Sequence, residues 1–112
     1  MTAEKCVECG LCKANCPVFK SELTETNSPR GKAILIKNNV LDKVFYKCTL
    51  CKACKIECPL DIDLELGPIR EKLVHNKIET EANKKMIENV RKYGNPFGKI
   101  EKNKIPKELY CC

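Results

Sequence analysis

A twelve-residue cysteine motif occurs twice in this chain and constrains its fold more than any other feature. Residues 6–17 read CVECGLCKANCP and residues 48–59 read CTLCKACKIECP, so that every cysteine and the closing proline are in register. Both copies have the spacing C-x2-C-x2-C-x3-C-P. Two further cysteines, Cys111 and Cys112, bring the total to ten among 112 residues. A cysteine content above about 8% is typical of disulfide-bonded or metal-binding chains.

The remaining composition favours metal over disulfides. Aromatic residues make up 5% of the chain and tryptophan is absent, so a chain this short has little material for an apolar core. The N-terminal residues do not form the apolar segment of a secretory signal, and the longest aliphatic run, residues 33–36, is far shorter than the roughly 20 residues of a membrane span. We therefore expect a cytoplasmic chain with no membrane span, in which closely spaced cysteines are metal ligands.

The spacing predicts which metal centre the cysteines bind. It is the spacing of bacterial ferredoxin-type [4Fe-4S] sites. The first three cysteines of each copy can wrap one cluster, whereas the fourth follows three residues later, precedes a proline and is aimed away from its own loop. We therefore predict two clusters with crossed ligands. The predicted ligands are Cys6, Cys9, Cys12 and Cys58 for cluster 1 and Cys48, Cys51, Cys54 and Cys16 for cluster 2. Cys111 and Cys112 are assigned to neither.

The alternative is a structural zinc module for protein interaction or nucleic-acid binding. Zinc sites usually use two C-x2-C pairs well separated in sequence, whereas here a third and a fourth cysteine follow at once.

The other side chains do not form a recognisable catalytic site. His75, the only histidine, is expected on a helix surface, and Asp61 and Asp63 are interpreted as caps of the following helix. The sequence thus predicts a non-catalytic electron-transfer subunit.

Helical patterns fill the rest of the chain. Ser28 as N-cap and Pro29 at the first position predict a helix of about ten residues that ends near Asn38 and Asn39, followed by a shorter helix running into Cys48. The pattern of residues 64–78 predicts a helix that begins near Pro68. The pattern of residues 79–96 predicts a further helix, which Gly94 and Pro96 terminate. The apolar residues that we interpret as core faces of the last two are Ile69, Leu73, Ile78, Ala82, Met86, Val90 and Tyr93.

Since no segment alternates like a strand, we expect an all-α fold, a helical ferredoxin with two [4Fe-4S] clusters, rather than the compact βαββαβ ferredoxin. The expected domains are residues 1–98, which carry both clusters, and a basic tail, residues 99–112, that ends in Cys-Cys.

The order of the first motif, Ser28-Pro29-Arg30-Gly31, the second motif and further helices resembles a known group over residues 4–98. This group has an α-helical ferredoxin domain and comprises the C subunit of heterodisulfide reductase, the glycolate oxidase iron–sulfur subunit and the C subunit of anaerobic glycerol-3-phosphate dehydrogenase. The chain is also similar to the C-terminal half of the succinate dehydrogenase iron–sulfur subunit. The resemblance implies a one-electron relay between a redox partner, often a flavin subunit, and a catalytic oxidoreductase subunit of heterodisulfide reductase or glycolate/lactate oxidase type.

The formal charge of +6 would fall to about +2 with eight thiolates and two oxidised clusters bound. The Lys-rich region from Lys84 onward could dock on an acidic redox partner or could be a solvated helix face. Nucleic-acid binding is not expected there, because aromatic residues that would stack on bases are sparse.

Overall fold

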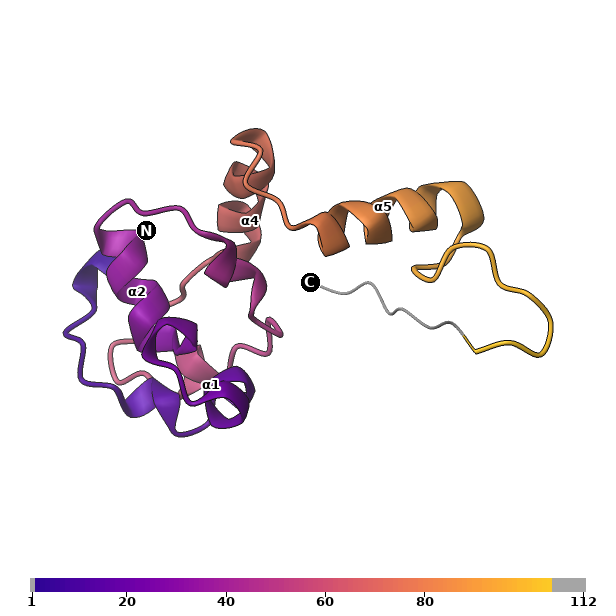
Figure 1. Ribbon diagram of the computed structural model, residues 1–112. Coiled ribbons are helices and arrows are strands. Elements are labelled where there is room, and N and C mark those ends of the chain that lie inside the picture. The colour runs from indigo at the N-terminus through magenta and orange to yellow at the C-terminus, as the bar shows by residue number, and fades with distance from the viewer. Residues whose placement is uncertain (1, 106–112) are drawn as a thin grey trace. The chain divides into compact units, whose positions relative to one another are not determined.

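The computed structural model describes residues 2–105, and all regular secondary structure in these residues is helical. The α-helices are α1 (Pro17–Glu22), α2 (Pro29–Lys37), α3 (Ala53–Glu57), α4 (Leu66–His75) and α5 (Glu81–Tyr93). The 3-10 helices are η1 (Thr2–Lys5), η2 (Leu11–Lys13), η3 (Glu25–Asn27) and η4 (Lys43–Tyr46). No β-strand occurs in these residues, which confirms the predicted all-α class. Irregular loops join the short helices (Figure 1).

The chain divides into two compact units, one up to Ile78 and one from Glu79 onward. Both cysteine motifs lie in the first unit. The predicted domain boundary between residues 98 and 99 stays a prediction. Cys111 and Cys112 lie outside the described residues.

Helix α2 begins and ends as the sequence predicts. The Ser28 hydroxyl accepts a hydrogen bond from the Gly31 amide at 3.0 Å, and Pro29 occupies the first helical position. Asn38 is the C-cap, and Asn39 is left-handed with φ 55°. The helix packs against η1, η2 and η3, so that it lies beside the first cysteine motif. The shorter helix predicted before Cys48 is the 3-10 turn η4.

The core of the first unit is small. By volume, its largest fully buried side chains are Phe45, Leu73 and Ser28. Because a residue as small as serine is the third largest of these, the core contains little apolar volume. Ile69 and Leu73 are 3% and 0% exposed, which confirms the predicted core face of α4. That helix begins at Leu66, before the predicted Pro68, because a proline in the first turn costs no intrahelical hydrogen bond. Four cysteines are partly buried against the core, namely Cys6, Cys48, Cys54 and Cys58.

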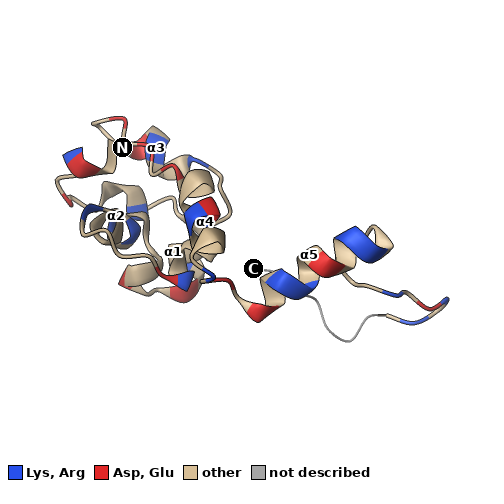
Figure 2. Ribbon diagram, turned by 90° about the horizontal axis from the view of Figure 1, so that it is seen from above, with Lys and Arg blue, Asp and Glu red and all other residues tan. Residues whose placement is uncertain are grey.

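Helix α5 is formed as predicted, but its apolar stripe is not a core face. Thr80 caps the helix and Gly94 ends it with φ 76°. Val90 and Tyr93 are 48% and 44% exposed, which contradicts the interpretation of these residues as core. Ile78 precedes the helix and packs instead on the core of the first unit. Acidic and basic residues alternate along α5 (Figure 2).

Gly31 is expected to tolerate no side chain. A Cβ at this position would collide with the backbone carbonyl of Glu25 in η3. That carbonyl accepts hydrogen bonds from the Ser28 amide at 3.0 Å and the Ser28 hydroxyl at 2.6 Å, so it cannot move aside freely. We expect Gly31→Ala to lower the free energy of unfolding by about 2–3 kcal/mol.

Anaerobic urea unfolding of the cluster-loaded protein measures this effect. The control is Gly67→Ala, because no atom beyond the neighbouring residues and the backbone of its own helix lies within 4 Å of a Cβ at this glycine. Alanine there should change stability by less than about 1 kcal/mol, because its higher helix propensity is opposed by the following Pro68. Equal effects of the two substitutions would rule out the collision as the reason for glycine at position 31.

Candidate metal centre

Two cavities in the first unit are each lined by three cysteines of one motif and one cysteine of the other. One cavity, of about 350 Å³ including its open mouth, is lined by Cys6, Cys9, Cys12 and Cys58. The other, of about 370 Å³, is lined by Cys16, Cys48, Cys51 and Cys54. In each cavity three cysteines come from one motif and the fourth from the other, and all eight are free thiols. This arrangement brings together the same sets that the sequence predicts, while the ligand assignment itself stays a prediction.

Contacts between the two motifs place the fourth cysteine of each beside the other motif. Turn η2 of the first motif packs against helix α3 of the second. The Asn15 side-chain amide donates a hydrogen bond to the Glu57 carboxylate at 2.5 Å. These two residues immediately precede Cys16 and Cys58, so the contact joins the motifs at equivalent positions. The two motifs therefore lie side by side and contact each other at equivalent positions of the sequence repeat.

The backbone of the two motifs is also repeated. Left-handed φ values occur at the third and fifth positions of each copy, namely Glu8 (61°), Gly10 (80°), Leu50 (58°) and Lys52 (62°). The Glu8 amide donates to Cys6 Sγ and the Leu50 amide to Cys48 Sγ, both at 3.4 Å. Non-glycine residues rarely adopt this conformation, and its recurrence curls each loop in the same way.

The donor set fits an iron–sulfur cluster better than a single metal ion. Within residues 2–105, no three histidine, cysteine, aspartate or glutamate side chains are close enough together to hold one ion. A structural zinc site would need four ligands within about 2.3 Å of one point. The cysteines instead line the walls of a wider cavity, and four cysteine thiolates are the usual ligand set of a [4Fe-4S] cluster.

Electrostatics within the site favour binding of a cation-rich cofactor. Burial and the neighbouring thiolate of Cys54 raise the pKa of Cys12 to about 11. Burial also raises the pKa of Cys54, and the thiolates of Cys48 and Cys16 raise it further. Without a cofactor these two cysteines are therefore neutral thiols near neutral pH, and ferric or ferrous iron would displace their protons and offset the mutual repulsion of the thiolates.

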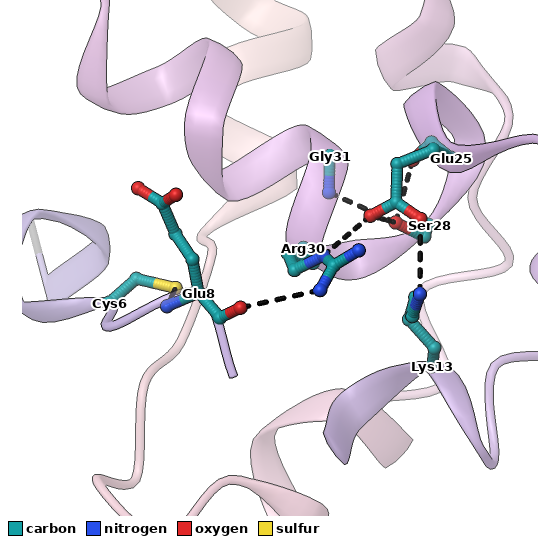
Figure 3. Close-up of polar contacts among 7 residues, drawn as sticks. All are labelled: Cys6, Glu8, Lys13, Glu25, Ser28, Arg30 and Gly31. Carbon is teal, nitrogen blue, oxygen red and sulfur yellow. Dashed lines mark hydrogen bonds and ion pairs between the residues drawn. The ribbon is translucent and has the colours of Figure 1, made fainter. Parts of the chain in front are cut away.

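The Ser28–Gly31 stretch places a guanidinium beside the first cavity. Arg30 lines that cavity, and its Nε donates to the Glu25 carboxylate at 2.6 Å. Lys13 pairs with the same carboxylate at 3.1 Å. These hydrogen bonds lower the pKa of Glu25, with Arg30 as the main cause. Figure 3 shows Arg30 between this carboxylate and the Glu8 carbonyl, which accepts from Nη1 at 3.4 Å. The sequence predicted the capping role of Ser28 and Pro29 and made the stretch a mark of the family, but it gave no signal that Arg30 lies at the cavity.

Two smaller expectations have different outcomes. His75 is exposed at the end of α4, which confirms it as a surface residue. The interpretation of Asp61 and Asp63 as helix caps is wrong, because the N-cap of α4 is Glu65 and no side chain caps it. Asp63 instead accepts from the Lys52 ammonium at 2.7 Å and the Glu65 amide at 3.0 Å. Hydrogen bonding to Lys52 lowers the pKa of Asp63.

Across residues 2–105, none of the helices has both the length and the apolar character needed to cross a membrane.

Comparison with known proteins supports the iron–sulfur assignment. The chain is 37% identical over 62 residues to the glycolate oxidase iron–sulfur subunit of Escherichia coli, in an alignment that covers 48% of this chain and 15% of that protein. It is 33% identical over 60 residues to the C2 subunit of the H(2)/formate:CoB-CoM heterodisulfide,ferredoxin reductase of Methanococcus maripaludis, and this alignment covers 53% of this chain and 33% of that protein. Both relatives belong to the group that the motifs resemble, so the resemblance is confirmed. No solved structure matches the chain significantly.

The chain therefore spans only a minor part of the length of either curated relative. A family model described as a 4Fe-4S dicluster domain matches residues 2–62, more than half of the chain, and this range includes both cysteine motifs. The cofactor type predicted from the cysteine spacing, [4Fe-4S], agrees with that description. On these grounds the chain belongs to the 4Fe-4S dicluster domain family.

Proposed function

We propose that this chain binds two [4Fe-4S] clusters and relays single electrons between a redox partner and a catalytic oxidoreductase subunit. The observation that carries the proposal is the pair of cavities, each lined by four cysteines drawn from both motifs. Cys6, Cys9, Cys12 and Cys58 would hold cluster 1, and Cys48, Cys51, Cys54 and Cys16 would hold cluster 2. A cluster of this type supplies one-electron chemistry with little change in geometry.

The two sites adjoin, as a relay requires. A further cavity, of about 290 Å³, is lined by cysteines of both sets, Cys6, Cys12, Cys54 and Cys58. Ala33, Ile62 and Leu64 complete its wall with apolar surface. Because electron tunnelling falls steeply with distance, neighbouring sites support transfer from one cluster to the other. No substrate-binding group is needed for this role.

The relatives indicate the kind of complex in which the relay would work. The names of both describe subunits of oxidoreductases, one a glycolate oxidase and one a heterodisulfide reductase. We propose a flavin-containing redox partner on one side and a catalytic subunit of this type on the other. Residues 1–98 would form the electron-transfer domain, in the cytoplasm, and substrate chemistry would reside in the partner subunit rather than in this chain.

Cofactor content tests the proposal directly. Protein purified under anaerobic conditions should be brown, with iron and acid-labile sulfide near eight atoms each per chain, as two [4Fe-4S] clusters require. Stoichiometric reduction with dithionite should consume about two electrons per chain, since each cluster accepts one.

The alternative structural module makes the opposite prediction. A colourless protein that contains zinc and takes up no electrons would contradict the relay. Cys9→Ser provides a matched internal check, because Cys9 lines only the first cavity. The iron content of this variant should fall by no more than about half, because the second site should keep its cluster when the first loses one.

A further inference from the structure

A buried ammonium lies beside the second cavity. Lys32, in α2, is 2% exposed and lines the same cavity as the cysteines predicted to hold cluster 2. Its Nζ donates to the backbone carbonyls of Asn27 at 2.5 Å and Lys47 at 2.8 Å. Burial lowers the pKa of Lys32, and the thiolates of Cys48 and Cys16 oppose that effect. Bonds this short are typical of a charged donor.

A second cation holds the same segment of backbone. Arg70, half-buried in α4, donates from Nε to the Phe45 carbonyl at 3.1 Å. Its Nη2 donates to the carbonyls of Tyr46 at 3.1 Å and Cys48 at 2.7 Å. Together with the Lys32 bond, the carbonyls of four consecutive residues, 45–48, are bound by two cations. These residues lead directly into the second cysteine motif.

Neither cation is neutralised by an acidic side chain. Among the described residues, Lys32 and Arg70 make no ion pair within 4.0 Å, and their acceptors are neutral carbonyls. Beside the first motif, Lys13 and Arg30 share the single carboxylate of Glu25, and Lys37 pairs with Glu8, so that one positive charge is left uncompensated there. Lys52 also lines the second cavity, but it pairs with Asp63, so the two uncompensated charges beside that cavity are those of Lys32 and Arg70. The surroundings of the second cavity are therefore more positive than those of the first.

Solvent access does not offset this difference in charge. Each cavity has one exposed cysteine, Cys9 in the first and Cys51 in the second. The second also includes Cys16, which is 9% exposed. Positive charge in a poorly solvated environment stabilises the more negative of two redox states, because the Coulomb energy is weakly screened there. For an iron–sulfur cluster the more negative state is the reduced one, and nearby charge is one of the factors that set its potential.

We propose that Lys32 and Arg70 raise the reduction potential of cluster 2 above that of cluster 1, so that cluster 2 is reduced first. This inference rests on the proposed two-cluster function. In each reduction one cluster accepts one electron and its formal charge becomes more negative by one. The electron comes from the redox partner in the complex, or from dithionite through mediators in a titration. Electrons entering at cluster 1 would therefore pass downhill to cluster 2.

An anaerobic redox titration of the whole chain, followed by EPR, tests the inference. The signals are first assigned with Cys9→Ser and Cys51→Ser, since Cys9 lines the first cavity and not the second, and Cys51 lines the second and not the first. In the unsubstituted protein the signal perturbed by Cys51→Ser should appear at the higher potential. Lys32→Gln keeps a donor for the backbone carbonyls but removes the charge. It should shift the midpoint of cluster 2 to lower potential and leave that of cluster 1 nearly unmoved.

Lys37→Gln is the matched control. Lys37 lies on the same helix and donates to the Cys6 carbonyl at 3.1 Å, so it is the first-motif counterpart of Lys32. Its charge is compensated by the Glu8 carboxylate at 2.8 Å. Lys37→Gln also removes one unit of positive charge, but the Lys37 side chain is 29% exposed and solvent screens its charge, so the downward shift of cluster 1 should be smaller than the shift that Lys32→Gln causes in cluster 2. The order of reduction should not change.

The outcomes separate the inference from the proposed function. A protein with a single cluster would contradict the proposed function itself. A two-cluster protein in which cluster 1 is reduced first, or in which Lys32→Gln moves both midpoints equally or not at all, would overturn the inference alone. If Lys32→Gln loses iron, Arg70→Gln and the order of reduction in the unsubstituted protein decide the question.

Discussion

Replacement of Cys16 by serine is expected to disrupt the cluster bound by the second motif, although Cys16 belongs to the first. The reason is its position: Cys16 lines the cavity of Cys48, Cys51 and Cys54 and is absent from the lining of the cavity of Cys6, Cys9, Cys12 and Cys58. We expect EPR spectra of reduced Cys16→Ser to lose or change the signal that Cys51→Ser also changes. Iron content should fall by up to about half, the share of one of two clusters.

The signal of the other cluster provides the control. It should be altered by Cys9→Ser and nearly unaltered by Cys16→Ser. Cys58→Ser should show the reverse pattern, because Cys58 lines the cavity of Cys6, Cys9 and Cys12. If Cys16→Ser instead changed the same signal as Cys9→Ser, each motif would bind its own cluster, and the crossed arrangement would be wrong while the relay remained possible.

Removal of the clusters is expected to abolish cooperative unfolding of the first unit. A unit of this size rarely obtains more than about 3–5 kcal/mol from its core, and here the fully buried large side chains are few. The cysteines pack against that core, so release of iron leaves unligated thiols beside Phe45, Leu73 and their neighbours. Binding energy of metal ligands that come from distant parts of a chain is also folding energy.

The measurement is thermal unfolding by circular dichroism before and after anaerobic chelation. The cluster-loaded protein should show one sharp transition, and the apoprotein a broad, weak one. Reconstitution with iron and sulfide should restore the sharp transition, which separates cluster loss from irreversible damage. Persistence of a sharp transition at the same temperature after chelation would show that the clusters are not part of the fold.

The site was more predictable from the sequence than its surroundings. Cysteine spacing encodes which thiolates can reach a common cluster, and the structure gathers the predicted sets around two cavities. Local signals were equally informative for α2, because an N-cap serine, a proline at the first position and terminal asparagines act within a few residues. These predictions needed no knowledge of tertiary packing.

Predictions that depended on packing were less reliable. The apolar stripe of α5 has the period of a core face, yet periodicity cannot say whether another element covers it, and Val90 and Tyr93 are largely exposed. Asp63 is of a residue type that often caps helices, but its carboxylate forms an ion pair with Lys52 instead. Lys32 gives no sequence signal of burial, since lysine is almost always exposed unless its charge is satisfied.

The left-handed turns recur in the two motifs, but their fifth positions meet different neighbours. A Cβ on Gly10 would lie 2.9 Å from Nη1 of Arg30, so a side chain at the fifth position of the first loop requires the guanidinium to move. The same position of the second loop carries Lys52, whose ammonium reaches Asp63. An exchange of the two loops would therefore not be reciprocal. The first loop could replace the second at the cost of one ion pair, whereas the second could not occupy the place of the first without displacing Arg30.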